Sequence, residues 1–393
     1  MLELLWLLLP VAAASGWFAA RRGQRRRPVS DGSQRNPAYF RGLNHLLNEE
    51  PDKAIDVFVE MLEVDSETVE THLALGNLFR RRGEVDRAIR IHQNLIARPA
   101  LSREQRAQAL LELGQDYMRA GLYDRAENLF KELRDSRQHP AEALRNLLVI
   151  YQQEKDWEAC LKIAEELAPL VQEPMLLERA HYYCELANKL VQAGHYGRAN
   201  ALLRKALSAH KNCVRALHMQ ADIAIRQDDW REAIRQLKRA GELQPEYLAE
   251  VLPQLVECHR RIGDLPGLRR YLEETLAAHP ESCVALYLAD LIQETEDDAA
   301  AAAFLGEEVR RHPSLRGLKR LSELHADLPG GKADQVLDTL RGHLSDLLRG
   351  RPGYRCTQCG FEAKTLHWQC PSCRSWGTVK PRNDHDEQRQ ITQ

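Results

Sequence analysis

The stretch "HLALGNLFRRRGEVDRAIRIH", residues 72–92, decides the fold of this chain. Gly83 is a helix breaker between two amphipathic halves, and Ala88 follows it by five residues. The stretch "LLELGQDYMRAGLYDRAENLF", residues 110–130, has the same residue types in the same order. Each stretch therefore predicts one helix, a tight turn and a second helix that packs back on the first.

The pattern recurs along the chain, and copies begin near residues 35, 69, 107, 141, 180, 214, 248, 282 and 314. Its residue types resemble the tetratricopeptide repeat, in which small residues let paired helices approach and large apolar residues fill the gap. A generic helical bundle would not require so regular a spacing. We therefore expect an all-α solenoid of about nine helical hairpins over residues 37–349, with degenerate copies from residue 248 onward.

A different pattern ends the chain. "YRCTQCGFEAKTLHWQCPSCRSWGTV", residues 354–379, holds two C-x2-C pairs. This spacing predicts that one metal ion is held tetrahedrally by Cys356, Cys359, Cys370 and Cys373. Because the apolar core of such a segment is small, we expect the metal to be needed for its fold.

The two cysteine pairs resemble rubredoxin knuckles, which hold iron, and zinc ribbons have the same geometry. Arg374 stands where the second rubredoxin knuckle has glycine, and the stretch between the pairs is short. The sequence thus predicts a rubredoxin-like or zinc-ribbon module over residues 350–380, with iron or zinc left open. We expect the module to pack against the last repeats through Trp368 or Trp376, and a disordered tail over residues 381–393.

The N-terminal stretch "LELLWLLLPVAAASGWFAA", residues 2–20, carries one charged residue, Glu3. As a helix it would be about 28 Å long, close to the thickness of a bilayer core. "RRGQRRR", residues 21–27, follows it directly. The positive-inside rule then predicts a transmembrane anchor over residues 1–20, a basic juxtamembrane linker over 21–36 and a cytoplasmic body.

Composition argues against catalysis and against nucleic-acid binding. The formal net charge is −2, and the basic residues cluster in the linker. The sequence holds no glycine-rich phosphate loop, H-E-x-x-H helix or G-x-S-x-G elbow. We predict no enzyme, no catalytic residue, no organic-cofactor site and no nucleic-acid partner. A solenoid of this kind is typical of proteins that bind other proteins.

The combination of anchor, repeats and four-cysteine module resembles the lipopolysaccharide assembly protein B family, over essentially the full length. The resemblance implies a single-pass protein of the bacterial inner membrane that faces the cytoplasm. It also implies an adaptor that promotes degradation of the lipid A deacetylase by a membrane-bound ATP-dependent metalloprotease. Other lipopolysaccharide-assembly proteins are implied partners, and a homo-oligomer stays open. A generic membrane-tethered scaffold and a rubredoxin-like electron carrier are the alternatives.

Overall fold

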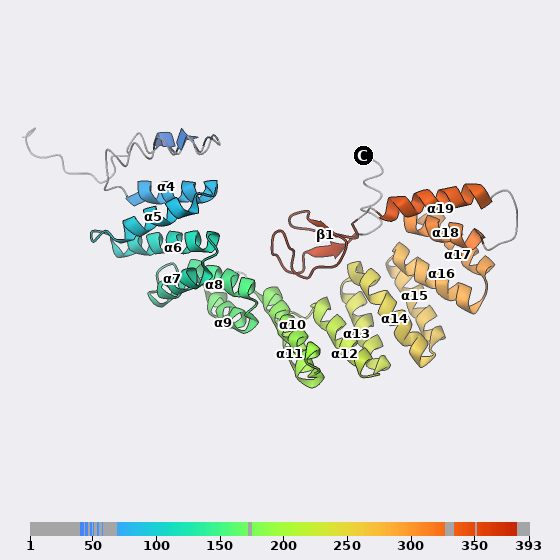
Figure 1. Ribbon diagram of the computed structural model, residues 1–393. Coiled ribbons are helices and arrows are strands. Elements are labelled where there is room, and N and C mark those ends of the chain that lie inside the picture. Colours follow the sequence, from blue (N-terminus) through green and yellow to red (C-terminus); the bar gives the residue numbers. More distant parts are fainter. Residues whose placement is uncertain are drawn as a thin grey trace, which may run out of the picture. The chain divides into compact units, whose positions relative to one another are not determined.

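The computed structural model describes residues 69–171, 175–326, 334–349 and 352–382, with a few positions between 40 and 57. The chain forms two compact units, residues 1–143 and 144–393. Figure 1 shows a series of helices followed by a small strand module. This confirms the predicted all-α repeat fold with a small C-terminal module.

Unit 1 consists of paired helices. They are α4 (Val69–Arg82), α5 (Val85–Ile96), α6 (Arg103–Arg119) and α7 (Tyr123–Asp135). Gly83, between α4 and α5, has φ +87°, a conformation that glycine adopts without strain. α6 begins with a capping box, in which Ser102 and Gln105 each accept a hydrogen bond from the other's backbone N–H. The turn and the cap therefore set where these helices end and begin.

Unit 2 continues the pairs and ends in strands. α8 (Pro140–Glu154) spans the boundary between the units. The other helices are α9 (Trp157–Leu167), η2 (Ala168–Leu170), α10 (Leu176–Gln192), α11 (Tyr196–Ala209), α12 (Val214–Arg226), α13 (Trp230–Leu243), η3 (Pro245–Tyr247), α14 (Leu248–Ile262), α15 (Leu265–Ala278), α16 (Ser282–Thr295), α17 (Asp298–Arg311), α18 (Leu315–Ala326) and α19 (Asp334–Arg349).

The observed pairs match the predicted copies within a few residues. Within the described ranges there are eight pairs of α-helices, from α4 to α19. The predicted first copy, near residue 35, lies mostly outside the described residues. Ala54, one of its described positions, is fully buried in a cluster with Leu75, Leu78, Phe79 and Ala88. Helix pairs thus continue through the region of the degenerate copies after residue 248.

Glycines on the first helices permit the close packing that the pattern predicted. A Cβ built on Gly114 of α6 would lie 2.6 Å from ring carbons of Phe130 on α7. A Cβ on Gly76 of α4 would lie 2.3 Å from Nε2 of His92 on α5. The two repeats therefore use the same contact, with histidine in place of phenylalanine in the first.

We expect Gly114→Ala to lower the free energy of unfolding by about 1–3 kcal/mol, because the added methyl overpacks against Phe130. The matched control is Gly197→Ala on α11, where an added Cβ meets nothing within 4 Å. That change should raise stability by about 0.5–1 kcal/mol through better helix propensity. Urea denaturation followed by circular dichroism measures both, and equal effects would contradict the packing argument.

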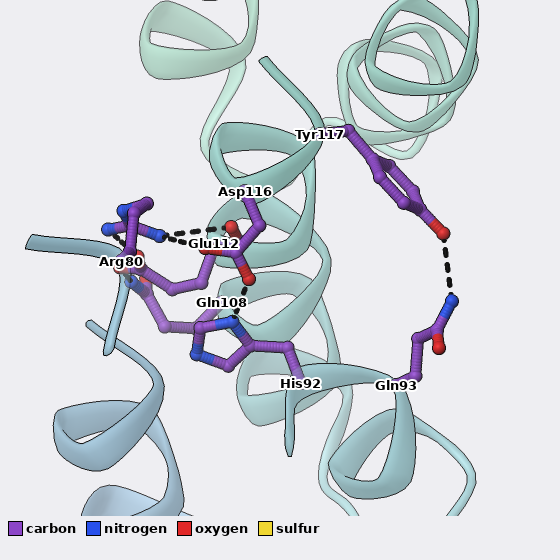
Figure 2. A network of polar contacts seen from close by, with 7 residues as sticks. All are labelled: Arg80, His92, Gln93, Gln108, Glu112, Asp116 and Tyr117. Atoms are coloured by element: carbon purple, nitrogen blue, oxygen red, sulfur yellow. Dashed lines mark hydrogen bonds and ion pairs between the residues drawn. The ribbon is translucent and has the colours of Figure 1, made fainter. Parts of the chain in front are cut away.

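A buried polar network joins α4, α5 and α6 of unit 1 (Figure 2). Asp116 is fully buried and accepts a hydrogen bond from Arg80 Nη1 at 2.8 Å. Its other oxygen lies 2.5 Å from Nδ1 of the equally buried His92. Arg80 also pairs with Glu112 at 2.7 Å. Because a buried charge without a partner is costly, these contacts fix the register of α4 and α5 against α6.

The predicted anchor and basic linker, residues 1–36, lie outside the described residues. In the part of the chain that the structure describes, no helix has the length and apolar character to cross a bilayer.

Candidate metal centre and its contact with the repeats

The C-terminal module is a small antiparallel sheet in the order β2-β1-β3. Its strands are β1 (Tyr354–Cys356), β2 (Glu362–Ala363) and β3 (Val379–Pro381). Arg382 pairs with Glu362 at 3.3 Å, and its backbone N–H donates to the Gly353 carbonyl. Residues 381 and 382 of the predicted tail therefore belong to the module, and residues 383–393 lie outside the described residues.

The sheet and its turns bring the four predicted ligands together. The sulfur atoms of Cys356, Cys359, Cys370 and Cys373 all lie within 4.8 Å of one another. The Sγ atoms of Cys356 and Cys373 are 3.7 Å apart, as are those of Cys359 and Cys370. A tetrahedral site with metal–sulfur bonds of about 2.3 Å would place its sulfurs about 3.8 Å apart. The four thiols thus fit one tetrahedral metal ion, and four sulfur donors suit both iron and zinc.

The two cysteine turns have the same backbone geometry. The N–H of Gly360 donates to the Cys356 carbonyl at 3.0 Å, and the N–H of Arg374 donates to the Cys370 carbonyl at 2.9 Å. Gly360 has φ +76°, and Arg374 has φ +60°. Arg374 therefore adopts the left-handed conformation that glycine would adopt freely, at a cost of about 1–2 kcal/mol.

Local hydrogen bonds favour thiolates at this centre. Burial raises the pKa of Cys356, but contacts with the Thr378 hydroxyl and with the N–H groups of Cys359 and Gln358 outweigh it, so that the pKa falls to about 6. The Ser375 hydroxyl and N–H lower the pKa of Cys373. Burial raises the pKa of Cys370 to about 11, so the hydrogen bonds favour the thiolate form, which binds a metal of this class, at Cys356 and Cys373.

Trp376 anchors the module on the repeats. Its ring stacks on His181 of α10, with ring centres 5.0 Å apart. It also meets Tyr182 of α10 and Trp157 of α9 edge-on, each at 5.9 Å. Trp376 is only 5% exposed. Because aromatic pairs at these distances add to the energy of burial, this cluster stabilises the docked module.

Trp368 makes the second contact. It stacks on Tyr247 of η3 at 5.6 Å and lies 5.9 Å from the guanidinium of Arg215 on α12. Lys380 of β3 lies over the Tyr247 ring at 4.4 Å and pairs with Glu246 at 3.2 Å. The module thus meets several consecutive repeats through alternating aromatic and cationic groups.

Two further polar contacts extend the interface. The Tyr354 hydroxyl donates to Glu250 on α14, and Gln369 donates to Gln152 on α8 at 3.2 Å. Contacts therefore run from α8 to α14, along one face of unit 2. The predicted use of Trp368 and Trp376 is confirmed, but the predicted site at the last repeats is wrong. The complementary aromatic groups lie on the middle repeats, about 100–200 residues before the module in sequence.

His181 and Arg215 were not predicted as members of a site. His181 is 2% exposed, and burial together with the neighbouring Arg215, His210 and Lys380 lowers its pKa to about 3. The neutral imidazole can stack between module and repeat without a charge to desolvate. The sequence signal was weak, a histidine followed by "YYC" on one helix.

We expect acid to weaken the docked state through His181. The pKa of His181 in the folded protein is below its unfolded value of 6.5. The stability that neutral His181 contributes is therefore fully present above pH 6.5 and is lost as pH falls toward 3. Between pH 7.5 and 5 this effect lowers the free energy of unfolding by about 2 kcal/mol. Chemical denaturation at both pH values measures it. His181→Phe keeps a stacking ring and should remove that part of the pH dependence; an unchanged dependence would contradict the assignment.

Comparison with known proteins agrees with this architecture. A family model described as a rubredoxin metal binding domain matches residues 354–381, and tetratricopeptide-repeat models match residues 71–107, 111–169 and 190–252. Lipopolysaccharide assembly protein B of Escherichia coli (strain K12) is 40% identical over 382 residues, which cover 97% of this chain and 98% of the relative. The protein of that name from Haemophilus influenzae is 36% identical, over 98% of this chain and 100% of the relative. The chain therefore belongs to the lipopolysaccharide assembly protein B family.

Proposed function

We propose that this protein is a membrane-anchored, non-enzymatic adaptor that regulates lipopolysaccharide assembly on the cytoplasmic side of the bacterial inner membrane. The observation that carries the proposal is the repeat array joined to a docked four-cysteine module, in a chain that shares 36–40% identity with the named relatives. Repeat arrays offer extended surfaces for protein partners. The family name supplies the process in which those partners act.

The metal gives the adaptor a rigid second element. We assign Cys356, Cys359, Cys370 and Cys373 as the ligands of one iron or zinc ion, on the basis of their 4.8 Å cluster. When bound, the ion ties the two cysteine turns together. The module then covers part of the face that the middle repeats form, so a partner that uses this face would contact repeats and module together.

The proposed partners are a lipid A deacetylase and a membrane-bound ATP-dependent metalloprotease. The repeats would hold the deacetylase, and the N-terminal segment would keep it beside the protease. Tethering raises the effective concentration of one partner near the other, by up to millimolar values for short linkers. This accounts for an anchor on a protein that performs no chemistry of its own.

Two experiments test the proposal. Purification of the full chain from detergent extract should recover both the protease and the deacetylase. Deletion of residues 1–20 should leave deacetylase binding intact while the deacetylase accumulates in cells. Full regulation by the truncated, soluble protein would exclude tethering as the mechanism, and absence of both partners from the purified complex would exclude the adaptor role.

A further inference from the structure

A partly open pocket of about 200 Å³, here called the seam cavity, lies at the contact between module and repeats. The repeats contribute His181, His210, Arg215 and Tyr247 to its wall, and the module contributes Trp368 and Lys380. Its lining includes two permanent cations and no carboxylate. A ligand in this cavity would therefore meet positive charge from both sides of the contact.

Several polar atoms at the cavity have no hydrogen-bond partner among the described residues. Arg215 is 8% exposed and donates from Nη2 to Glu185 at 2.7 Å, while its buried Nη1 is unpartnered. The Nδ1 atoms of His181 and His210 are also buried and unpartnered. Because buried donors and acceptors are nearly always satisfied by protein, water or ligand, these three atoms leave hydrogen-bonding capacity for a polar occupant of the cavity.

Both cations at the cavity have partners, and Lys380 Nζ also donates to Gln244 Oε1 at 3.2 Å, so one Nζ hydrogen and Arg215 Nη1 are left for an anion. Glu185 and Glu246 pair with Arg215 and Lys380, but neither carboxylate lines the cavity. Cys213, Val214 and Arg215 at the start of α12 line the cavity, with the Cys213 thiol beside the backbone N–H groups of Arg215 and Ala216. A helix N-terminus attracts anions through its free N–H groups and its dipole.

We propose that the seam cavity binds a phosphate group, which Arg215 and the start of α12 contact from the repeats and Lys380 contacts from the module. A guanidinium, an ammonium and a helix N-terminus together are the groups that recognise phosphate. The volume is below the roughly 300 Å³ at which pockets for drug-sized ligands begin. It suits inorganic phosphate or the phosphate of a small headgroup.

Binding there would strengthen docking of the module. The ligand contacts groups from both partners, so it binds the docked state better than the released state. Such a difference shifts the equilibrium toward docking, by a factor of about 100 at a phosphate concentration 100 times Kd. The site would thus couple phosphate availability to the surface that the adaptor presents. This inference does not depend on the identity of the adaptor's protein partners.

The test is titration of the metal-loaded full chain, in detergent, with inorganic phosphate at constant ionic strength. Isothermal calorimetry should show one saturable site per chain, and the thermal midpoint of unfolding should rise with phosphate. Arg215→Gln and Lys380→Gln should each weaken binding at least tenfold. The matched control is Arg260→Gln, since Arg260 pairs with Glu294 at 2.7 Å on an exposed surface of α14 and α16. That variant should bind phosphate normally.

Further arms identify the source of the phosphate. Acetate should compete far less well, because it has one negative charge and two acceptor oxygens, whereas phosphate has more of both. Short-chain phosphatidylglycerol, dissolved in the same detergent, would identify a lipid headgroup if it displaces phosphate where short-chain phosphatidylcholine does not; absence of displacement would identify free phosphate. Arg215 also contacts the tryptophan rings, so tryptophan fluorescence must show that each variant stays docked. If Arg215→Gln releases the module, phosphate binding by Lys380→Gln decides whether the proposal holds. No saturable binding, or equal binding by the docked variants, would overturn the proposal.

Discussion

Cys356→Ser is expected to unfold the C-terminal module and leave the helical repeats folded. The buried residues of the module's own core are Cys356, Cys370 and Val379, far too few to fold about 30 residues without a metal. Structural zinc sites contribute about 10–16 kcal/mol to folding, and loss of one of four thiolates forfeits most of it. Metal analysis should show loss of the bound ion. Near-ultraviolet circular dichroism should lose the part of the tryptophan signal that Trp368 and Trp376 contribute, while far-ultraviolet helix content stays almost unchanged.

The control for this change is Cys283→Ser, which alters a partly buried cysteine on α16 outside the cluster. It should keep one metal per chain and an unchanged tryptophan signal. Metal retained in full by Cys356→Ser would contradict the assignment of the ligands. The absorption spectrum of the unaltered protein separates the two candidate ions, because four-thiolate iron absorbs visible light and zinc does not.

The sequence predicted the repeats and the metal cluster because both depend on short-range spacing. Gly114 and Phe130 are fixed relative to each other by one turn between two helices, so their pairing is visible in the residue pattern. The cysteines are likewise fixed by tight turns, in one of which Gly360, directly after Cys359, has a positive φ. Local rules of this kind hold without knowledge of the rest of the fold.

The docking site could not be predicted in the same way. Trp157, His181 and Tyr247 come from different repeats, and only the stacking of the solenoid places them near Trp368 and Trp376. None belongs to a recognisable motif. The same holds for the buried network of unit 1, in which His92 occupies an aromatic position of the repeat and finds Asp116 24 residues later. Polar and aromatic contacts between repeats depend on the stacking geometry, which residue spacing does not encode.

Trp376→Ala is expected to release a folded, metal-bound module from the repeats. Trp376 is 5% exposed and packs against rings from α9 and α10. It is not one of the buried residues that surround the cysteines. Truncation of a buried tryptophan costs about 3–5 kcal/mol. Hydrogen exchange at His181 and Tyr182 should become faster, and protease should cut between α19 and β1, while metal content stays at one ion per chain.

Two further variants make this result specific. Trp376→Phe keeps an aromatic ring and should release the module in a smaller fraction of molecules. Trp230→Ala removes a partly buried tryptophan from α13, where it faces Arg261 and not the module, and should leave docking intact. Unchanged exchange at His181 in Trp376→Ala would contradict the role of Trp376. Cys356→Ser loses both metal and docking, whereas Trp376→Ala loses docking alone. Comparison of the two variants therefore separates the effect of the metal from the effect of docking. Equal loss of partner binding in both would show that the ion acts by holding the module against the repeats.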